Sequence, residues 1–108
     1  MIGPVPEIGV AELQPKLRAG AVLLDVREPH EFVEVRAPQA RNVPLQSVPD
    51  VVHDLPTDVP VYVICRSGGR SHNACAFLRD RGIDAVNVVG GTDAWVAAGI
   101  AVASGQPS

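Results

Sequence analysis

Residues 61–71 read VYVICRSGGRS, with a run rich in β-branched residues, then a cysteine, and then two glycines between two arginines. The run Val61–Ile64 predicts a strand buried on both faces, as is typical of a parallel sheet. A helix is expected from Ser71 to about Arg81, ended by Gly82. A buried strand, a short glycine-containing loop and a helix in this order indicate an α/β fold.

The same alternation of strands and helices continues on both sides of this stretch. Helices are predicted at Val10–Ala19, at Glu28–Val35, at Val48–Leu55 with Ser47 as its cap, and at the end of the chain up to Ala98, with Thr92 as its cap. Strands are predicted at Ala21–Val26, Asn42–Val43 and Ala85–Val89. We therefore expect an α/β domain whose central, mainly parallel sheet is flanked by helices, with ligands bound at the carboxyl ends of the strands.

Length and composition fit one domain without a nucleic-acid or membrane partner. The chain has 108 residues, 46% of them hydrophobic, and a formal net charge of −3. We expect the domain to span residues 5–100, with flexible ends at 1–4 and 101–108. An acidic protein is a poor match for a phosphate backbone. Neither a signal peptide nor a membrane-spanning stretch is recognisable, so we expect a cytoplasmic protein with reduced thiols.

The loop after Val61–Ile64 has the features of a site that activates a cysteine. Glycine allows the backbone to turn successive N–H groups inward, and the following helix adds free N–H groups at its N-terminus. Arg66 and Arg70 add positive charge nearby. These groups would stabilise a thiolate and lower the pKa of Cys65. The alternative is that Cys65 is a small buried hydrophobic residue at the end of a strand.

Four segments together resemble the rhodanese family of sulfurtransferases. CRSGGRS at 65–71 resembles the active-site loop of the family, and LLDVREPHEF at 23–32 resembles the segment around its second strand. RNVPL at 41–45 and VVGGTDAW at 88–95 resemble two further family segments. The resemblance covers roughly residues 5–100, in the expected order.

The resemblance implies a five-stranded parallel sheet and a ping-pong sulfurtransferase cycle. A sulfane donor such as thiosulfate or a persulfide would load Cys65 as a persulfide, and a thiol or cyanide would then take the outer sulfur. A protein is a further option as acceptor. The cycle implies no cofactor beyond the covalent persulfide on Cys65.

The resemblance also assigns expected roles to the residues around Cys65. The residues expected to cradle the sulfur are Arg66, Ser67, Gly68, Gly69, Arg70 and Ser71. Asp25, Arg27 and Glu28 match an acidic–basic cluster of the family. We expect this cluster to form a structural ion-pair network, with Arg27 near the mouth of the pocket as the alternative.

The chain departs from the family pattern in two places. Residues 35–40 keep only Pro38 and Ala40 of a family motif, so the local loop is expected to differ. Thiosulfate-preferring members often have a cationic residue two places after the cysteine, where this chain has Ser67. The identity of the sulfur donor therefore stays open.

Other functions use a cysteine in a similar setting. A cysteine phosphatase needs one more residue between its cysteine and arginine than the four that separate Cys65 from Arg70. An arsenate reductase, a persulfide carrier without turnover and a regulatory module are further alternatives, although inactive relatives usually lack the cysteine.

The remaining reactive side chains are expected to be structural. Cys75 is expected to pack in the core, with a resolving thiol for Cys65 as the alternative. His72 is expected to face solvent, and Trp95 to pack in the core or the pocket wall. No set of cysteines and histidines has the spacing of metal ligands, so we expect no metal site.

Overall fold

The computed structural model describes residues 4–107 and contains a five-stranded parallel sheet. The strands are β1 (Glu7–Ile8), β2 (Val22–Asp25), β3 (Arg41–Asn42), β4 (Val61–Ile64) and β5 (Ala85–Val88). Their order in the sheet is β1-β5-β4-β2-β3, and each neighbouring pair is parallel. The expected fold class is confirmed, and β4 lies at the centre of the sheet.

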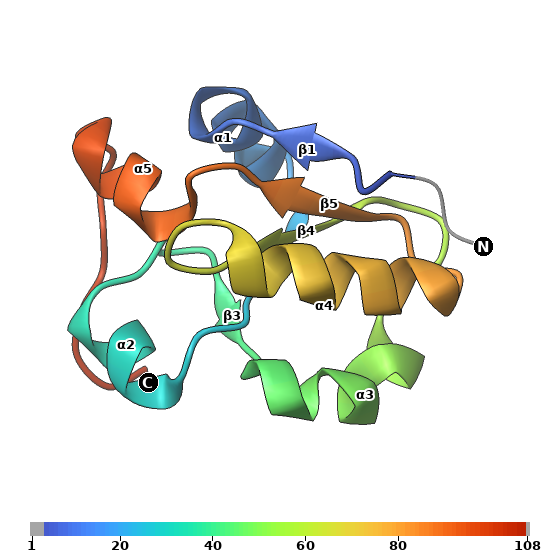
Figure 1. The fold of residues 1–108 in the computed structure, drawn as a ribbon. Helices are drawn as coiled ribbons and strands as arrows, with labels where there is room; N and C mark the ends of the chain where they lie inside the picture. The colour runs from blue at the N-terminus through green and yellow to red at the C-terminus, as the bar shows by residue number, and fades with distance from the viewer. Residues whose placement is uncertain (1–3, 108) are drawn as a thin grey trace.

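Helices cover both faces of this sheet (Figure 1). The helices are α1 (Val10–Arg18), α2 (Pro29–Glu34), α3 (Val48–Val51), α4 (Gly69–Asp80) and α5 (Gly91–Ala97). Residues of α3 and α4 pack in one apolar cluster, and residues of α1 and α5 pack in the other. The loop after β2 leads into α2, and the loop after β4 leads into α4. Both loops lie at the carboxyl ends of their strands.

Successive side chains along β4 point to opposite faces of the sheet and so belong to different apolar clusters. Val61, Val63 and Cys65 belong to the cluster under α3 and α4, whereas Tyr62 and Ile64 belong to the cluster under α1 and α5. All four residues of the strand are buried, as its apolar sequence predicts. Cys65 is therefore the first residue after a strand that is fixed on both faces.

The structure corrects the predicted starts of the last two long helices. Gly68, at φ +123°, occupies the N-cap, and α4 begins at Gly69 instead of Ser71. Gly90 occupies the N-cap of α5, so Thr92 lies inside that helix and does not cap it. In both cases a glycine with positive φ turns the chain from a strand end into a helix, which a β-carbon would disfavour.

Two other elements differ from the predictions. The predicted helix Val48–Leu55 is a single α-helical turn between two 3-10 turns, Leu45–Ser47 and Val52–Asp54, and the Ser47 side chain makes no cap bond. Strand β1 was not recognised from its residues, because it contains only two of them.

The segment after α5 is attached to the body of the protein. Ala103 exchanges two backbone hydrogen bonds with Arg36, and the Gly105 N–H donates to the Val33 carbonyl. Arg36 also donates from its side chain to the carbonyls of Phe32 and Gly105. This C-terminal segment passes beside α2 (Figure 1). The flexibility expected for 1–4 and 101–108 stays a prediction, and residues 1–3 and 108 lie outside the described residues. Within residues 4–107, no helix is long and apolar enough to cross a membrane.

Candidate active site

Cys65 is buried beneath the loop that follows β4, with 1% of its surface exposed. Its Sγ accepts a hydrogen bond from the Gly68 N–H at 3.1 Å and lies 3.2 Å from the Ser71 hydroxyl. Gly68 adopts a φ of +123°, which lets the chain turn from this loop into α4 while its N–H faces the sulfur. The sequence prediction of inward N–H groups around Cys65 agrees with this geometry.

Two opposing effects set the pKa of Cys65. Burial raises the pKa of the thiol, whereas hydrogen bonds from the Ser71 hydroxyl and from the backbone of Ser71, Gly68 and Ser67 lower it. The hydrogen bonds prevail, so the pKa of Cys65 lies below its ordinary value. The thiolate is the nucleophilic form of cysteine, and the hydrogen bonds of the loop therefore favour this form of Cys65.

Helix α5 fixes the backbone of the loop from behind. The N–H and hydroxyl of Thr92 donate to the Cys65 carbonyl at 2.8 and 3.1 Å, and the Asp93 N–H donates to the Arg66 carbonyl at 3.0 Å. A β-carbon on Gly91 would lie 2.4 Å from the Cys65 carbonyl oxygen. The glycine pair at the start of α5, with Gly90 at the N-cap and Gly91 as first residue, thus allows the helix N-terminus to approach this loop closely.

Asp25 and Arg27 form a buried ion pair at the end of β2. The Arg27 Nε and Nη2 donate to both carboxylate oxygens of Asp25, and Nη2 also donates to the Val35 carbonyl. Asn42 anchors the same turn by donating to the carbonyls of Asp25 and Arg27. Asp25 and Arg27 thus pair as two members of the expected three-residue cluster, and Arg27 also lines the cleft described below.

Glu28 does not join this ion pair. Arg70 is bound instead by Glu31, a residue that was not predicted from the sequence. The Glu28 N–H donates to the Glu31 carboxylate at the start of α2. The same carboxylate accepts two hydrogen bonds from Arg70, at 2.7 and 2.9 Å. The Arg70 hydrogen bond lowers the pKa of Glu31 to about 2. The signal for Glu31 was its position three residues after Glu28, the spacing of a capping box.

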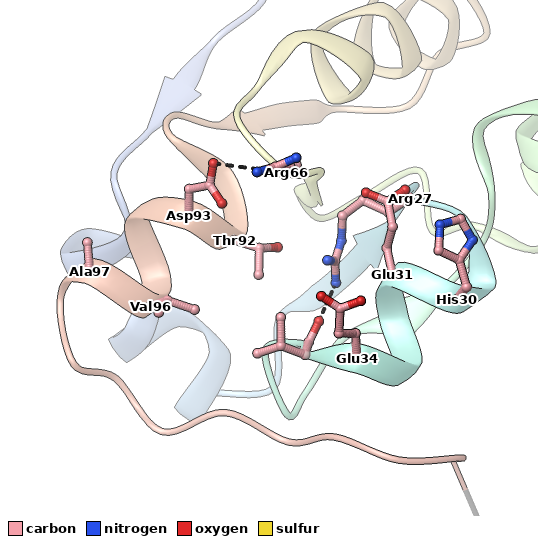
Figure 2. Close-up of a pocket in the computed structure, with 10 residues that line it drawn as sticks. Arg27, His30, Glu31, Glu34, Arg66, Thr92, Asp93, Val96 and Ala97 are labelled. Carbon is pink, nitrogen blue, oxygen red and sulfur yellow. Dashed lines mark hydrogen bonds and ion pairs between the residues drawn. The ribbon is translucent and has the colours of Figure 1, made fainter.

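A cleft of about 710 Å³ opens between α2 and α5, beside the reactive loop (Figure 2). Arg27 points into it from the turn after β2, and Arg66 reaches over it from the loop. Arg66 is exposed and lies 3.6 Å from the Asp93 carboxylate. Val96 and Ala97 give the α5 side an apolar character. The cleft is large enough for a small organic molecule.

The other predicted residues lie away from the reactive sulfur or in the core. Cys75 is fully buried in α4, and burial raises its pKa to about 12, so it packs in the core as a thiol. His72 is exposed. Trp95 is buried in the cluster under α1 and α5, and its ring N–H donates to the Ala101 carbonyl. Residues 4–107 contain no cluster of three or more metal-ligating side chains.

Asn87 in β5 was missed, although it lies at the site. Its side chain contacts Ser71 and Gly68, which both lie beside Cys65. The signal available in the sequence was a single polar residue within the apolar run 85–89.

The fold and this loop define a class of small α/β proteins in which a hydrogen-bonded cysteine follows the central strand. A model of the rhodanese-like domain matches residues 9–98, and the chain belongs to this family. YtwF of Bacillus subtilis is 40% identical over 93 residues, which cover 84% of this chain and 90% of that protein. The thiosulfate sulfurtransferase GlpE of Pseudomonas putida is 34% identical over 84 residues, covering 77% and 76% of the two chains.

A solved structure agrees with this assignment. The rhodanese-related protein of Thermoplasma volcanium superposes with a TM-score of 0.84 at 33% identity, covering 91% of this chain and 97% of the other. The family membership and the sulfurtransferase relatives support sulfurtransferase activity in general terms.

Proposed function

We propose that this protein is a sulfurtransferase that carries sulfane sulfur on Cys65. The Cys65 thiolate attacks the sulfane sulfur of a donor, a new S–S bond forms, and the donor leaves with the electrons of the bond that breaks. An acceptor nucleophile then attacks the outer sulfur and releases Cys65 as a thiolate. The observation that carries the proposal is the donation of the Gly68 N–H to a buried Cys65 Sγ beside the Ser71 hydroxyl.

The loop suits the negative charge that this cycle places on sulfur. The outer sulfur of a persulfide is anionic, and it would lie among the backbone N–H groups at the start of α4. Arg66 lies over the cleft, so its guanidinium would attract an anionic donor. Arg27 uses Nε and Nη2 for Asp25 and Val35, which leaves Nη1 for an anion in the cleft. The cycle needs no cofactor beyond the persulfide itself.

The position of Arg70 argues against phosphate chemistry. A cysteine phosphatase places its loop arginine on the phosphate, but Arg70 here forms two hydrogen bonds with Glu31. The loop is also one residue shorter than a phosphatase loop. A sulfur atom is smaller than a phosphate group and matches the shorter loop.

Thiosulfate or a persulfide is the proposed donor, and cyanide, a small thiol or a protein thiol the proposed acceptor. GlpE relatives are named thiosulfate sulfurtransferases, which supports thiosulfate. Ser67 is exposed and neutral, whereas a cation at this position would assist the binding of thiosulfate, which is a dianion. This difference supports a persulfide as donor. The cleft accommodates an acceptor larger than cyanide.

The proposal is tested by loading the protein with each donor and measuring intact mass. We expect a gain of one sulfur atom, lost again when cyanide or a thiol is added. Cys65→Ser removes the gain, and Cys75→Ser, the matched control, retains it because burial raises the pKa of Cys75 to about 12 and keeps it a thiol. No gain with either donor, together with turnover of an aryl phosphate, would overturn the proposal. Loading that no small acceptor reverses, but a protein thiol does, would identify a carrier.

A further inference from the structure

Asn87 is a polar residue on an apolar face of the sheet. Its strand neighbour Ala85 and its cross-strand partner Val63 both lie in the cluster under α3 and α4. Asn87 itself is 3% exposed. Burying an amide is unfavourable unless its hydrogen bonds are made, so the partners of Asn87 indicate its role.

Both ends of the Asn87 amide contact the reactive loop. Its Oδ1 accepts from the Ser71 hydroxyl at 2.5 Å, and its Nδ2 donates to the Gly68 carbonyl at 3.2 Å. The second bond fixes the orientation of the amide, because turning it over would place two oxygens against each other. Asn87 therefore presents an acceptor to Ser71.

Ser71 has one hydroxyl proton and three acceptors within reach. These are Asn87 Oδ1 at 2.5 Å, Cys65 Sγ at 3.2 Å and the Gly68 carbonyl at 3.2 Å. When Cys65 is a thiol, its S–H can donate to Ser71 Oγ while Ser71 donates to Asn87. When Cys65 is a thiolate, Ser71 stabilises it only by turning its proton away from Asn87, which leaves two oxygens facing each other.

We propose that Asn87 is a positioning residue that competes with the Cys65 thiolate for the single proton of Ser71. Its action on Cys65 passes through Ser71. The consequence for catalysis rests on the proposed function. In a persulfide the inner sulfur is neutral and a weak acceptor, so Ser71 again donates to Asn87. Asn87 thus favours sulfur-loaded Cys65 over the empty thiolate.

The charged groups around Cys65 are held in pairs that do not involve Asn87. They are Arg70 of α4 with Glu31 of α2, Arg27 with Asp25 at the end of β2, and Arg66 with Asp93 of α5. Cys75 in α4 is a further titratable group that interacts with Cys65, and its raised pKa keeps it uncharged. Replacing Asn87 therefore changes the hydrogen bonding of Ser71 and Gly68 and leaves these charges in place.

The test compares Asn87→Leu with Asn42→Leu. Asn42 also donates its amide to backbone carbonyls near the site, but to those of Asp25 and Arg27. The measurement is the rate of Cys65 alkylation by iodoacetamide against pH, followed by mass spectrometry of the Cys65 peptide. We expect Asn87→Leu to lower the midpoint by about half a unit to one unit, the equivalent of one ordinary hydrogen bond. Asn42→Leu leaves the midpoint unchanged.

A midpoint that rises or stays constant in Asn87→Leu would overturn the proposal. Asn87→Ala, which adds no bulk, is expected to shift the midpoint in the same direction and serves if the leucine variant does not fold. In a Ser71→Ala background, Asn87→Leu should cause no further shift, and a shift of equal size there would show that Asn87 does not act through Ser71. These measurements need no sulfur donor, so they stand or fail independently of sulfur loading.

Discussion

At the scale of single residues, the pKa of Cys65 depends on hydrogen-bond donors that surround a buried sulfur. The sulfur loses water when it is buried, and this disfavours the thiolate. The Ser71 hydroxyl and the Gly68 N–H replace that water. The Gly68 N–H belongs to the backbone and is kept in most substitutions. The Ser71 hydroxyl belongs to a side chain and is removed by a single substitution.

Ser71→Ala is expected to raise the pKa of Cys65 by about one unit, since a hydrogen bond to a charged group is lost. The thiolate fraction at neutral pH then falls. The midpoint of the curve of alkylation rate against pH therefore moves to a higher pH than in the wild type. Ser67→Ala is the matched control, because it keeps the backbone N–H that stabilises the thiolate. Equal midpoints in Ser71→Ala and the wild type would contradict this role of the hydroxyl.

At the scale of elements, the site depends on how the helix α5 approaches the loop after β4. The first turn of α5 donates three hydrogen bonds to the carbonyls of Cys65 and Arg66. These bonds hold the outward side of the loop, so its N–H groups stay directed at the sulfur. The close approach requires a residue without a side chain at Gly91.

Gly91→Ala is expected to displace the loop and to reduce both stability and Cys65 reactivity. Its β-carbon would meet the Cys65 and Arg66 carbonyl oxygens at 2.4 and 2.6 Å, and its φ of +57° is unfavourable for alanine. We expect a loss of about 2–3 kcal/mol in the free energy of unfolding, measured by urea denaturation.

Gly99→Ala is the control for this substitution. Gly99 has a φ of +71° and no atom within 4 Å of an added β-carbon, so it carries the backbone cost without the collision. We expect a loss of about 1 kcal/mol there and normal Cys65 alkylation. If the two variants lost the same stability and reactivity, the contact between α5 and the loop would not be the cause.

At the scale of the whole molecule, the C-terminal segment closes over α2 and the loop that follows it. Arg36 is the centre of this contact, because its guanidinium lies 4.7 Å from the Phe32 ring centroid and binds the Gly105 carbonyl. Arg36 lies in the segment 35–40, where the sequence predicts a departure from the family motif, and it attaches the C-terminal segment to α2.

Arg36→Gln is expected to release the C-terminal segment and to lower the melting temperature by about 4–8 °C, which corresponds to about 1 kcal/mol for a domain of this size. Cys65 alkylation should change little, since the hydrogen bonds of Ala103 and Gly105 go to Val33 and Arg36. The melting temperature of Arg36→Gln is measured by calorimetry and compared with that of Arg41→Gln. Arg41 is an exposed residue of β3 and serves as the control. A melting temperature equal to that of the control would show that the segment contributes no stability.

The sequence alone determined the order of the main elements, the place of Cys65 directly after a buried strand and the family resemblance. These follow from local properties: apolar runs, glycines where the chain must turn, and the fixed spacing of CRSGGRS. Only the tertiary structure decided which partners the polar side chains find. Arg70 pairs with Glu31 across 39 positions, and Asn87 lies against Ser71 across 16. Such contacts arise from strand order and helix packing, which bring together residues that no local pattern connects.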